Sequence, residues 1–129
     1  MQPPTRSKKS VLIVDDEEDL RASVTMALEE RGYDVLSAGD GLEGIAAASE
    51  HSPNLILVDY RMPELDGVEF LNALRSTEGL TDTPVVIITV DPELELRRNA
   101  AQLGIQGFLV KPFSMEELMQ TVTNLLQTT

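Results

Sequence analysis

Five short apolar runs recur along the chain, and each is followed by a segment whose apolar residues have the spacing of an α-helix. The predicted strands are Val11–Val14, Asp34–Ser37, Leu55–Val58, Val85–Thr89 and Phe108–Val110. The first, third and fourth are almost continuously apolar, which is typical of parallel strands buried on both faces. This alternation limits the chain to a few α/β architectures.

The segments that follow the predicted strands have the pattern of amphipathic helices. Their apolar residues are Leu20, Val24, Ala27 and Leu28; Leu42, Ile45 and Ala46; Val68, Leu71 and Leu74; Leu96, Ala100 and Leu103; and Leu118, Val122 and Leu125. Gly32 and Gly104 follow the first and fourth segments, as glycine often does at helix ends. Ser114 and Glu117 predict a capping box at the start of the fifth. Five βα units predict an α/β fold: a doubly wound (βα)5 domain with a five-stranded parallel sheet.

Composition narrows the classes of function. The 129 residues predict one domain over residues 10–129, preceded by a disordered tail over residues 1–9. A formal charge of -12 without a cationic face argues against binding to nucleic acid or to acidic lipids. No apolar run approaches the ~20 residues that span a bilayer, and no signal-peptide pattern is present. Without cysteine there is no thiolate metal site, and we expect a cytoplasmic location.

Polar residues stand at the ends of four predicted strands. Asp15 and Asp16 follow the first, Asp59 follows the third, Thr89 ends the fourth and Lys111 follows the fifth. The carboxyl ends of parallel strands share one edge, where such sheets bind ligands. Clustered carboxylates favour a cation among them, and a small set of oxygen ligands suits Mg²⁺. Each residue alone could be a solvated loop residue. Together they predict a Mg²⁺-dependent phosphoryl site, because a carboxylate can attack phosphorus and a lysine can stabilise phosphoryl oxygens.

The segments "VLIVDDEED", "LILVDYRMPELDG", "VVIIT" and "FLVKPF" have the order and spacing that resemble the receiver domain of two-component response regulators. The resemblance runs from about Ser10 to Leu126, and D-x-x-M-P-x-x-D-G with K-P-F downstream is its most specific part. It implies a flavodoxin-like strand order 2-1-3-4-5 and a phosphoacceptor signalling switch. The implied phosphoryl donor is a sensor histidine kinase or a histidine phosphotransfer protein. An output partner or output domain, unknown from the sequence, would receive the signal.

The resemblance also implies roles for the strand-end residues. Asp59 is expected to accept the phosphoryl group. Asp16 and Asp59 are expected to bind Mg²⁺ directly, together with the backbone carbonyl of Arg61, while Asp15 would act through water. Lys111 would bind the phosphoryl group.

The implied conformational switch involves two further residues. On phosphorylation, the Thr89 hydroxyl would move toward the phosphoryl group and Phe108 would rotate into the vacated space. This would change the face formed by helix four, strand five and helix five, through which a homodimer is also possible. The bond between Lys111 and Pro112 is expected to be cis. Phe108 stands where the family commonly has tyrosine, so the hydrogen bond of a tyrosine hydroxyl is lost. Val90 stands where the family usually has a small residue, so access to the phosphoryl group could be narrowed.

Two other functions suit the sequence less well than the switch. A small Mg²⁺-dependent aspartyl phosphatase usually has D-x-D after the first strand and a cap, whereas this chain has adjacent Asp15 and Asp16 and no insertion for a cap. A mononucleotide carrier needs N–H donors where "DDEED" would repel phosphate. Glu17–Asp19 are expected to favour the positive end of the first helix and to need no role in metal binding. His51, the only histidine, is expected to be solvated.

Overall fold

The computed structural model describes residues 8–62, 65–90 and 104–126. The strands are β1 (Ser10–Val14), β2 (Asp34–Ala38), β3 (Leu55–Asp59), β4 (Val85–Thr89) and β5 (Gly107–Val110). They all pair in parallel, in the order β2-β1-β3-β4-β5. The predicted fold class and strand order are therefore confirmed, and each strand extends its predicted range by at most one residue.

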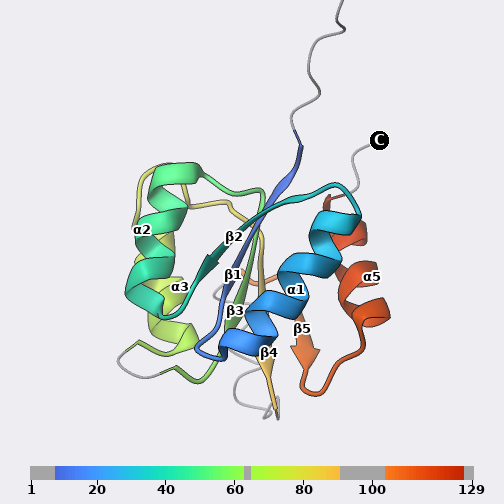
Figure 1. Cartoon of the computed structure of the whole chain (residues 1–129). Helices are drawn as coiled ribbons and strands as arrows, with labels where there is room; N and C mark the ends of the chain where they lie inside the picture. The colour runs from blue at the N-terminus through green and yellow to red at the C-terminus, as the bar shows by residue number, and fades with distance from the viewer. Residues whose placement is uncertain (1–7, 63–64, 91–103, 127–129) are drawn as a thin grey trace, which may run out of the picture.

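Helices cover both faces of this sheet (Figure 1). On one face lie α1 (Glu18–Glu30) and α5 (Met115–Leu126), and on the other lie α2 (Gly41–His51) and α3 (Gly67–Arg75). The fourth predicted helix, with Leu96, Ala100 and Leu103, lies outside the described residues, as do residues 1–7 of the predicted tail. Of the described helices, none is long and apolar enough to cross a membrane.

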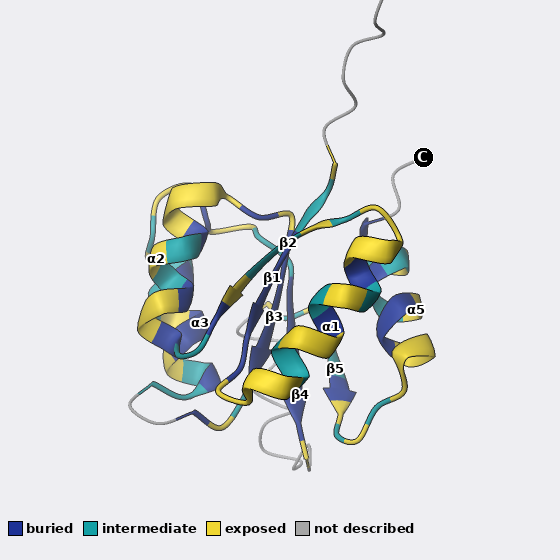
Figure 2. Cartoon of the chain, viewed as in Figure 1, coloured by how far each residue is buried: buried dark blue, intermediate teal, exposed yellow. Residues whose placement is uncertain are grey.

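The central strands β1, β3 and β4 are buried from both sides, whereas the outer strands β2 and β5 are partly exposed, as Figure 2 shows. Along β3, Ile56 and Val58 pack in the core beneath α2 and α3, whereas Leu55 and Leu57 pack in the core beneath α1 and α5. Because successive side chains of a strand point to opposite faces, a sheet covered on both sides requires apolar residues at every position. This explains the continuous apolar runs of β1, β3 and β4, and it also explains why the polar residue at the end of each of these three runs marks the edge of the sheet.

Side-chain hydrogen bonds fix where some helices begin. The predicted capping box before α5 is present, because Glu117 N donates to Ser114 Oγ at 3.0 Å and Ser114 N donates to Glu117 Oε1 at 3.3 Å. Asp66 caps α3 in the same way. At the start of α1, by contrast, the N-cap residue Glu17 makes no side-chain capping bond. Its carboxylate is therefore available to other partners.

Candidate metal and phosphoryl site

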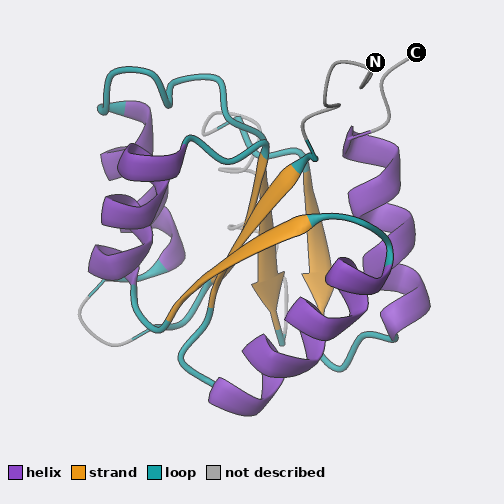
Figure 3. Ribbon diagram, turned by 45° about the horizontal axis from the view of Figure 1, so that its top comes forward, coloured by secondary structure: helices purple, strands orange, loops and turns teal. Residues whose placement is uncertain are grey.

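The parallel strands run in one direction and end at one edge of the sheet (Figure 3), and the predicted site residues stand at or directly after these ends. The register pairs Asp59 with Ile88 and Thr89 with Val110, so that the last residues of β3, β4 and β5 lie side by side. Asp15 continues directly from β1, and its N–H donates to the Ala38 carbonyl of β2 at 3.1 Å. Residues that are distant in sequence thus meet because parallel strands end at a common edge.

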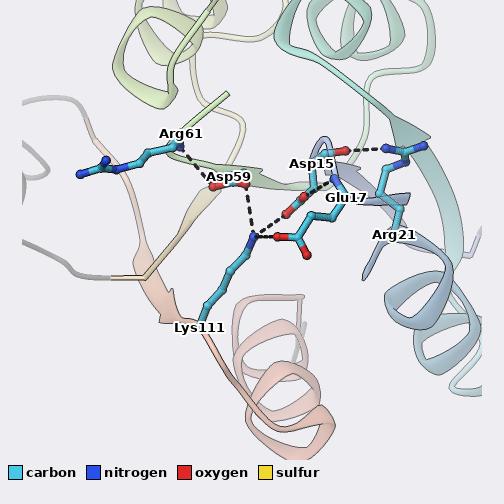
Figure 4. Close-up of polar contacts among 6 residues, drawn as sticks. All are labelled: Asp15, Glu17, Arg21, Asp59, Arg61 and Lys111. Atoms are coloured by element: carbon cyan, nitrogen blue, oxygen red, sulfur yellow. Dashed lines mark hydrogen bonds and ion pairs between the residues drawn. The ribbon is translucent and has the colours of Figure 1, made fainter. Parts of the chain in front are cut away.

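Three carboxylates form a cluster at this edge. One oxygen each from Asp15, Asp16 and Asp59 lies within 4.8 Å of the others. Asp15 is fully buried and Asp59 nearly so, whereas Asp16 is exposed. Backbone donors orient the two buried groups: Glu17 N donates to Asp15 Oδ1 at 2.8 Å, and Arg61 N donates to Asp59 Oδ1 at 3.1 Å (Figure 4).

Lys111 supplies the positive charge of the site (Figure 4). Its Nζ lies 3.2 Å from Asp15 Oδ2, 3.1 Å from Glu17 Oε1 and 3.3 Å from Asp59 Oδ2. Burial of the ammonium lowers its pKa, but the hydrogen bond to Glu17 and the charges of Asp15 and Asp59 outweigh that effect and raise the pKa of Lys111 above its ordinary value. Lys111 is therefore fully charged at neutral pH.

The pKa of Asp59 is also raised, but for a carboxyl group this favours the neutral form instead of the charged form. Burial, and then the negative charge of Asp15, raise the pKa of Asp59 above its ordinary value. The Arg61 N–H and the Lys111 ammonium lower it, and they only partly offset the first two effects. The charged form of Asp59 is thus held at a cost in free energy, which a further cation at the site would reduce.

The acid cluster fits a Mg²⁺ ion. Asp15 Oδ2 is buried and accepts no hydrogen bond from any residue within the described ranges, although Lys111 Nζ approaches it as an ion-pair partner. A buried carboxylate oxygen without a donor favours a cation, and a few hard oxygen ligands are typical of Mg²⁺. A cavity of about 190 Å³ adjoins the cluster, and it is lined by Asp16, Glu17, Asp59, Arg61, Thr89, Val90 and Lys111.

Two residues at this edge were missed in the sequence. Glu17 was expected only to favour the start of α1, yet its carboxylate contacts Lys111 across the site. Arg21 Nη1 donates to the Asp15 carbonyl at 2.6 Å, and its guanidinium lies against Gly39, where a Cβ atom would come within 3.3 Å of Nη1. The position of Glu17 directly after Asp15 and Asp16 was a signal for the first contact. Nothing in the sequence distinguished Arg21 from other helix-surface arginines.

Of the proposed switch residues, Thr89 ends β4 at the carboxyl edge of the sheet, and Phe108 lies in the neighbouring strand β5. Thr89 is buried and lines the site cavity. Phe108 is half-buried and packs against the core beneath α2 and α3. Val90 is largely exposed and lines the cavity wall. The peptide bond between Lys111 and Pro112 is cis. The roles assigned to these residues, and the ligand role of the Arg61 carbonyl, stay predictions.

The sheet order and the acid–lysine cluster define a doubly wound α/β domain with a cation-binding carboxyl edge. Residues 11–123 match the family model of the response regulator receiver domain, so the chain belongs to that family. It is a receiver domain of the response regulators, the phosphoacceptor modules of two-component signalling.

Curated relatives share this assignment. The transcriptional regulatory protein PrrA of Mycobacterium tuberculosis is 38% identical over 117 residues, which cover 91% of this chain and 49% of PrrA. The probable chemotaxis protein CheY of Rhizobium etli is 35% identical over 116 residues, which cover 89% of this chain and 90% of that protein. The chain thus spans about half the length of PrrA and nearly all of CheY.

Solved structures show the same fold. The chemotaxis protein CheY4 of Vibrio cholerae superposes with a TM-score of 0.89 at 34% identity, covering 93% of this chain and all of CheY4 (100%). The receiver domain of the sensor histidine kinase PA1611 of Pseudomonas aeruginosa has a TM-score of 0.83 at 26% identity, covering 95% of this chain and 100% of that domain. A magnesium ion is coordinated in the active site cleft of the PA1611 domain.

Proposed function

We propose that Asp59 accepts a phosphoryl group from phosphohistidine of a sensor histidine kinase or a histidine phosphotransfer protein, in a Mg²⁺-dependent reaction. The observation that carries this proposal is the meeting of Asp15, Asp16 and Asp59 with Lys111 at the carboxyl edge of the sheet. The alternative, an aspartyl phosphatase acting on other substrates, has no separate observation in its favour.

The side chains have distinct tasks in the proposed reaction. A carboxylate oxygen of Asp59 attacks phosphorus, the bond from phosphorus to the donor's imidazole nitrogen breaks, and an acyl phosphate forms. Lys111 Nζ, already 3.3 Å from Asp59 Oδ2, donates to a phosphoryl oxygen. Asp15, Asp16, Asp59 and the Arg61 carbonyl would hold Mg²⁺. When bound, Mg²⁺ neutralises charge on the phosphoryl oxygens and on the carboxylates.

The signal would leave the site through Thr89 and Phe108. Thr89 lines the site cavity, and its hydroxyl would bind a phosphoryl oxygen, which frees space for the Phe108 ring. The phenyl ring has no hydroxyl group, so packing alone would stabilise its alternative position. The output face would comprise β5, α5 and the predicted fourth helix, which falls outside the described residues. A partner, an output domain or a second copy in a homodimer would bind there.

The wider context of the chain follows from the same proposal. We place residues 10–129 in the receiver domain, with residues 1–9 as a tail, and we expect it to catalyse only its own phosphorylation and dephosphorylation. We assign it to the cytoplasm, which a cysteine-free sequence suits.

Acetyl phosphate and intact-mass measurement test the proposal directly. With Mg²⁺, the wild-type chain should gain one phosphoryl group, and Asp59→Asn should gain none. Omission of Mg²⁺ with excess EDTA should suppress the adduct. Steady turnover of unrelated phosphomonoesters, with no adduct on Asp59, would instead identify a phosphatase and contradict the proposed switch.

A further inference from the structure

Glu17 differs from the other two carboxylates that contact Lys111. The side chains of Asp15 and Asp59 are buried and are oriented by backbone N–H donors. The side chain of Glu17 is 62% exposed and reaches Lys111 Nζ from the solvent side, at 3.1 Å. It makes no capping bond to α1, so among the described contacts its carboxylate is committed only to Lys111. Glu17 is therefore the partner that Lys111 loses most easily.

Three carboxylates already surround the Lys111 ammonium: Glu17 and Asp59 accept hydrogen bonds from it, and Asp15 is its ion-pair partner. A phosphoryl group on Asp59 would compete with these carboxylates for the ammonium. Asp15 and Asp59 are held in place by the backbone, and moving them would disturb the acid cluster. The exposed Glu17 side chain, by contrast, turns into water at little cost, because exposed ion pairs are weak.

Glu17 is also placed to affect access to the site. It lines the cavity beside Asp59 and also a neighbouring, more apolar cavity of about 380 Å³ formed with Leu20, Val90, Pro112 and Phe113. The Glu17 carboxylate stands where these two cavities meet Lys111. In this position it neutralises the cation that an incoming phosphoryl group would otherwise encounter.

We propose that Glu17 is a positioning residue that competes with the phosphoryl group on Asp59 for the Lys111 ammonium and thereby slows phosphorylation. The proposal rests on the proposed function of Asp59 as phosphoacceptor. It assigns to Glu17 a regulatory role that its place at the start of α1 does not require. A side chain too short to reach Lys111, or one without charge, should release the ammonium for the incoming group.

Three variants separate contact from charge. Glu17→Gln removes the charge, whereas Glu17→Asp keeps the charge but shortens the side chain by one methylene, so that it no longer reaches Lys111 from the same backbone position. Glu18→Gln is the matched control, because it removes the same charge from the neighbouring exposed residue in the first turn of α1, for which no contact with Lys111 is found. Thermal melting in EDTA verifies that each variant folds.

The measurement is the rate of phosphoryl adduct formation from acetyl phosphate with Mg²⁺, followed by intact mass. Both Glu17 variants should react about 1.5- to 5-fold faster than wild type, the range that corresponds to an exposed ion pair, and Glu18→Gln should stay near the wild-type rate. A structural defect would slow the reaction, not accelerate it. Wild-type rates in both Glu17 variants would overturn the proposal. So would acceleration in Glu17→Gln alone, or an equal acceleration in Glu18→Gln, because either result identifies a general effect of charge.

These outcomes are distinguishable from failure of the proposed function. If Asp59 is not the phosphoacceptor, the wild-type chain forms no adduct that Asp59→Asn abolishes, and the rate comparison does not arise. If Asp59 is the phosphoacceptor and Glu17 has no part in positioning Lys111, the adduct forms at the same rate in wild type and in all three variants.

Discussion

Replacing Lys111 with methionine removes a cation that Asp15, Glu17 and Asp59 share, while it keeps a side chain of similar length. The Lys111 side chain is only 15% exposed, and the Asp15 carboxylate that it contacts is fully buried. After the replacement, in EDTA, the two buried carboxylates would face each other without the ammonium, and among the described contacts backbone N–H donors would remain to offset their charges. The native state should therefore lose stability at neutral pH.

The expected loss follows from the burial of the pair. Removing one partner of a buried ion pair costs about 3–5 kcal/mol. The site opens into a cavity that Asp16 and Glu17 also line, both of them exposed, so water screens part of the remaining charge. We therefore expect a loss of about 2–4 kcal/mol in the free energy of unfolding. At about 4 °C per kcal/mol for a chain of this size, the melting temperature should fall by roughly 8–16 °C.

Urea and thermal unfolding followed by circular dichroism would measure this loss. The experiments should be run in EDTA, with Lys8→Met as a control that removes an exposed lysine. The contribution of Lys111 is fully present at neutral pH, because its pKa is raised above the ordinary value of 10.5. It would disappear only as the pH rises through the raised value.

Mg²⁺ provides a second readout of the same replacement. Because no ammonium then competes for the carboxylates, Mg²⁺ should stabilise Lys111→Met more than it stabilises wild type. At 100 times the dissociation constant the gain is about 2.7 kcal/mol. If Lys111→Met were as stable as wild type in EDTA, the lysine would not be holding the acid cluster together, and the electrostatic account of the site would be wrong.

Three further predictions concern other parts of the domain. Burial, and then the neighbouring Asp15, raise the pKa of Asp59 above 3.8, so in EDTA the free energy of unfolding should fall as the pH rises from 3.8 through the raised value. Asp59→Asn should flatten this pH dependence in urea titrations, and an unchanged slope would show that Asp59 is not its source. A Cβ atom on Gly44 would lie 2.9 Å from Phe70 Cε1, so Gly44→Ala should cost about 1–3 kcal/mol in unfolding free energy, whereas Gly107→Ala, with open space around it, should not. Asp66→Ala removes the capping box of α3 and should cost about 1 kcal/mol in the same assay, and an unchanged free energy of unfolding would contradict a stabilising role of this cap.

The fold was readable from the sequence because its determinants are local. A run such as Val11–Val14, apolar at every position, suits a strand covered on both faces, and three such runs within five alternating strand and helix patterns predict a doubly wound parallel sheet. Ser114 and Glu117 marked the start of α5 through a contact that spans three residues. The acids and the lysine could be placed at one edge because parallel strands end together, whatever their separation in the sequence.

The sequence could not determine which of these groups form ion pairs and which are exposed to solvent. Glu17 and Lys111 are 94 residues apart, and the fold of α1 onto the same face of the sheet as α5 brings the exposed carboxylate to the ammonium. The same packing buries Asp15 completely while leaving Asp16 exposed, although the two are adjacent and chemically identical. By itself the sequence determined which residues reach the edge of the sheet. The tertiary structure decided which of them are buried and which are paired, because desolvation and ion pairing depend on all the elements that surround a group.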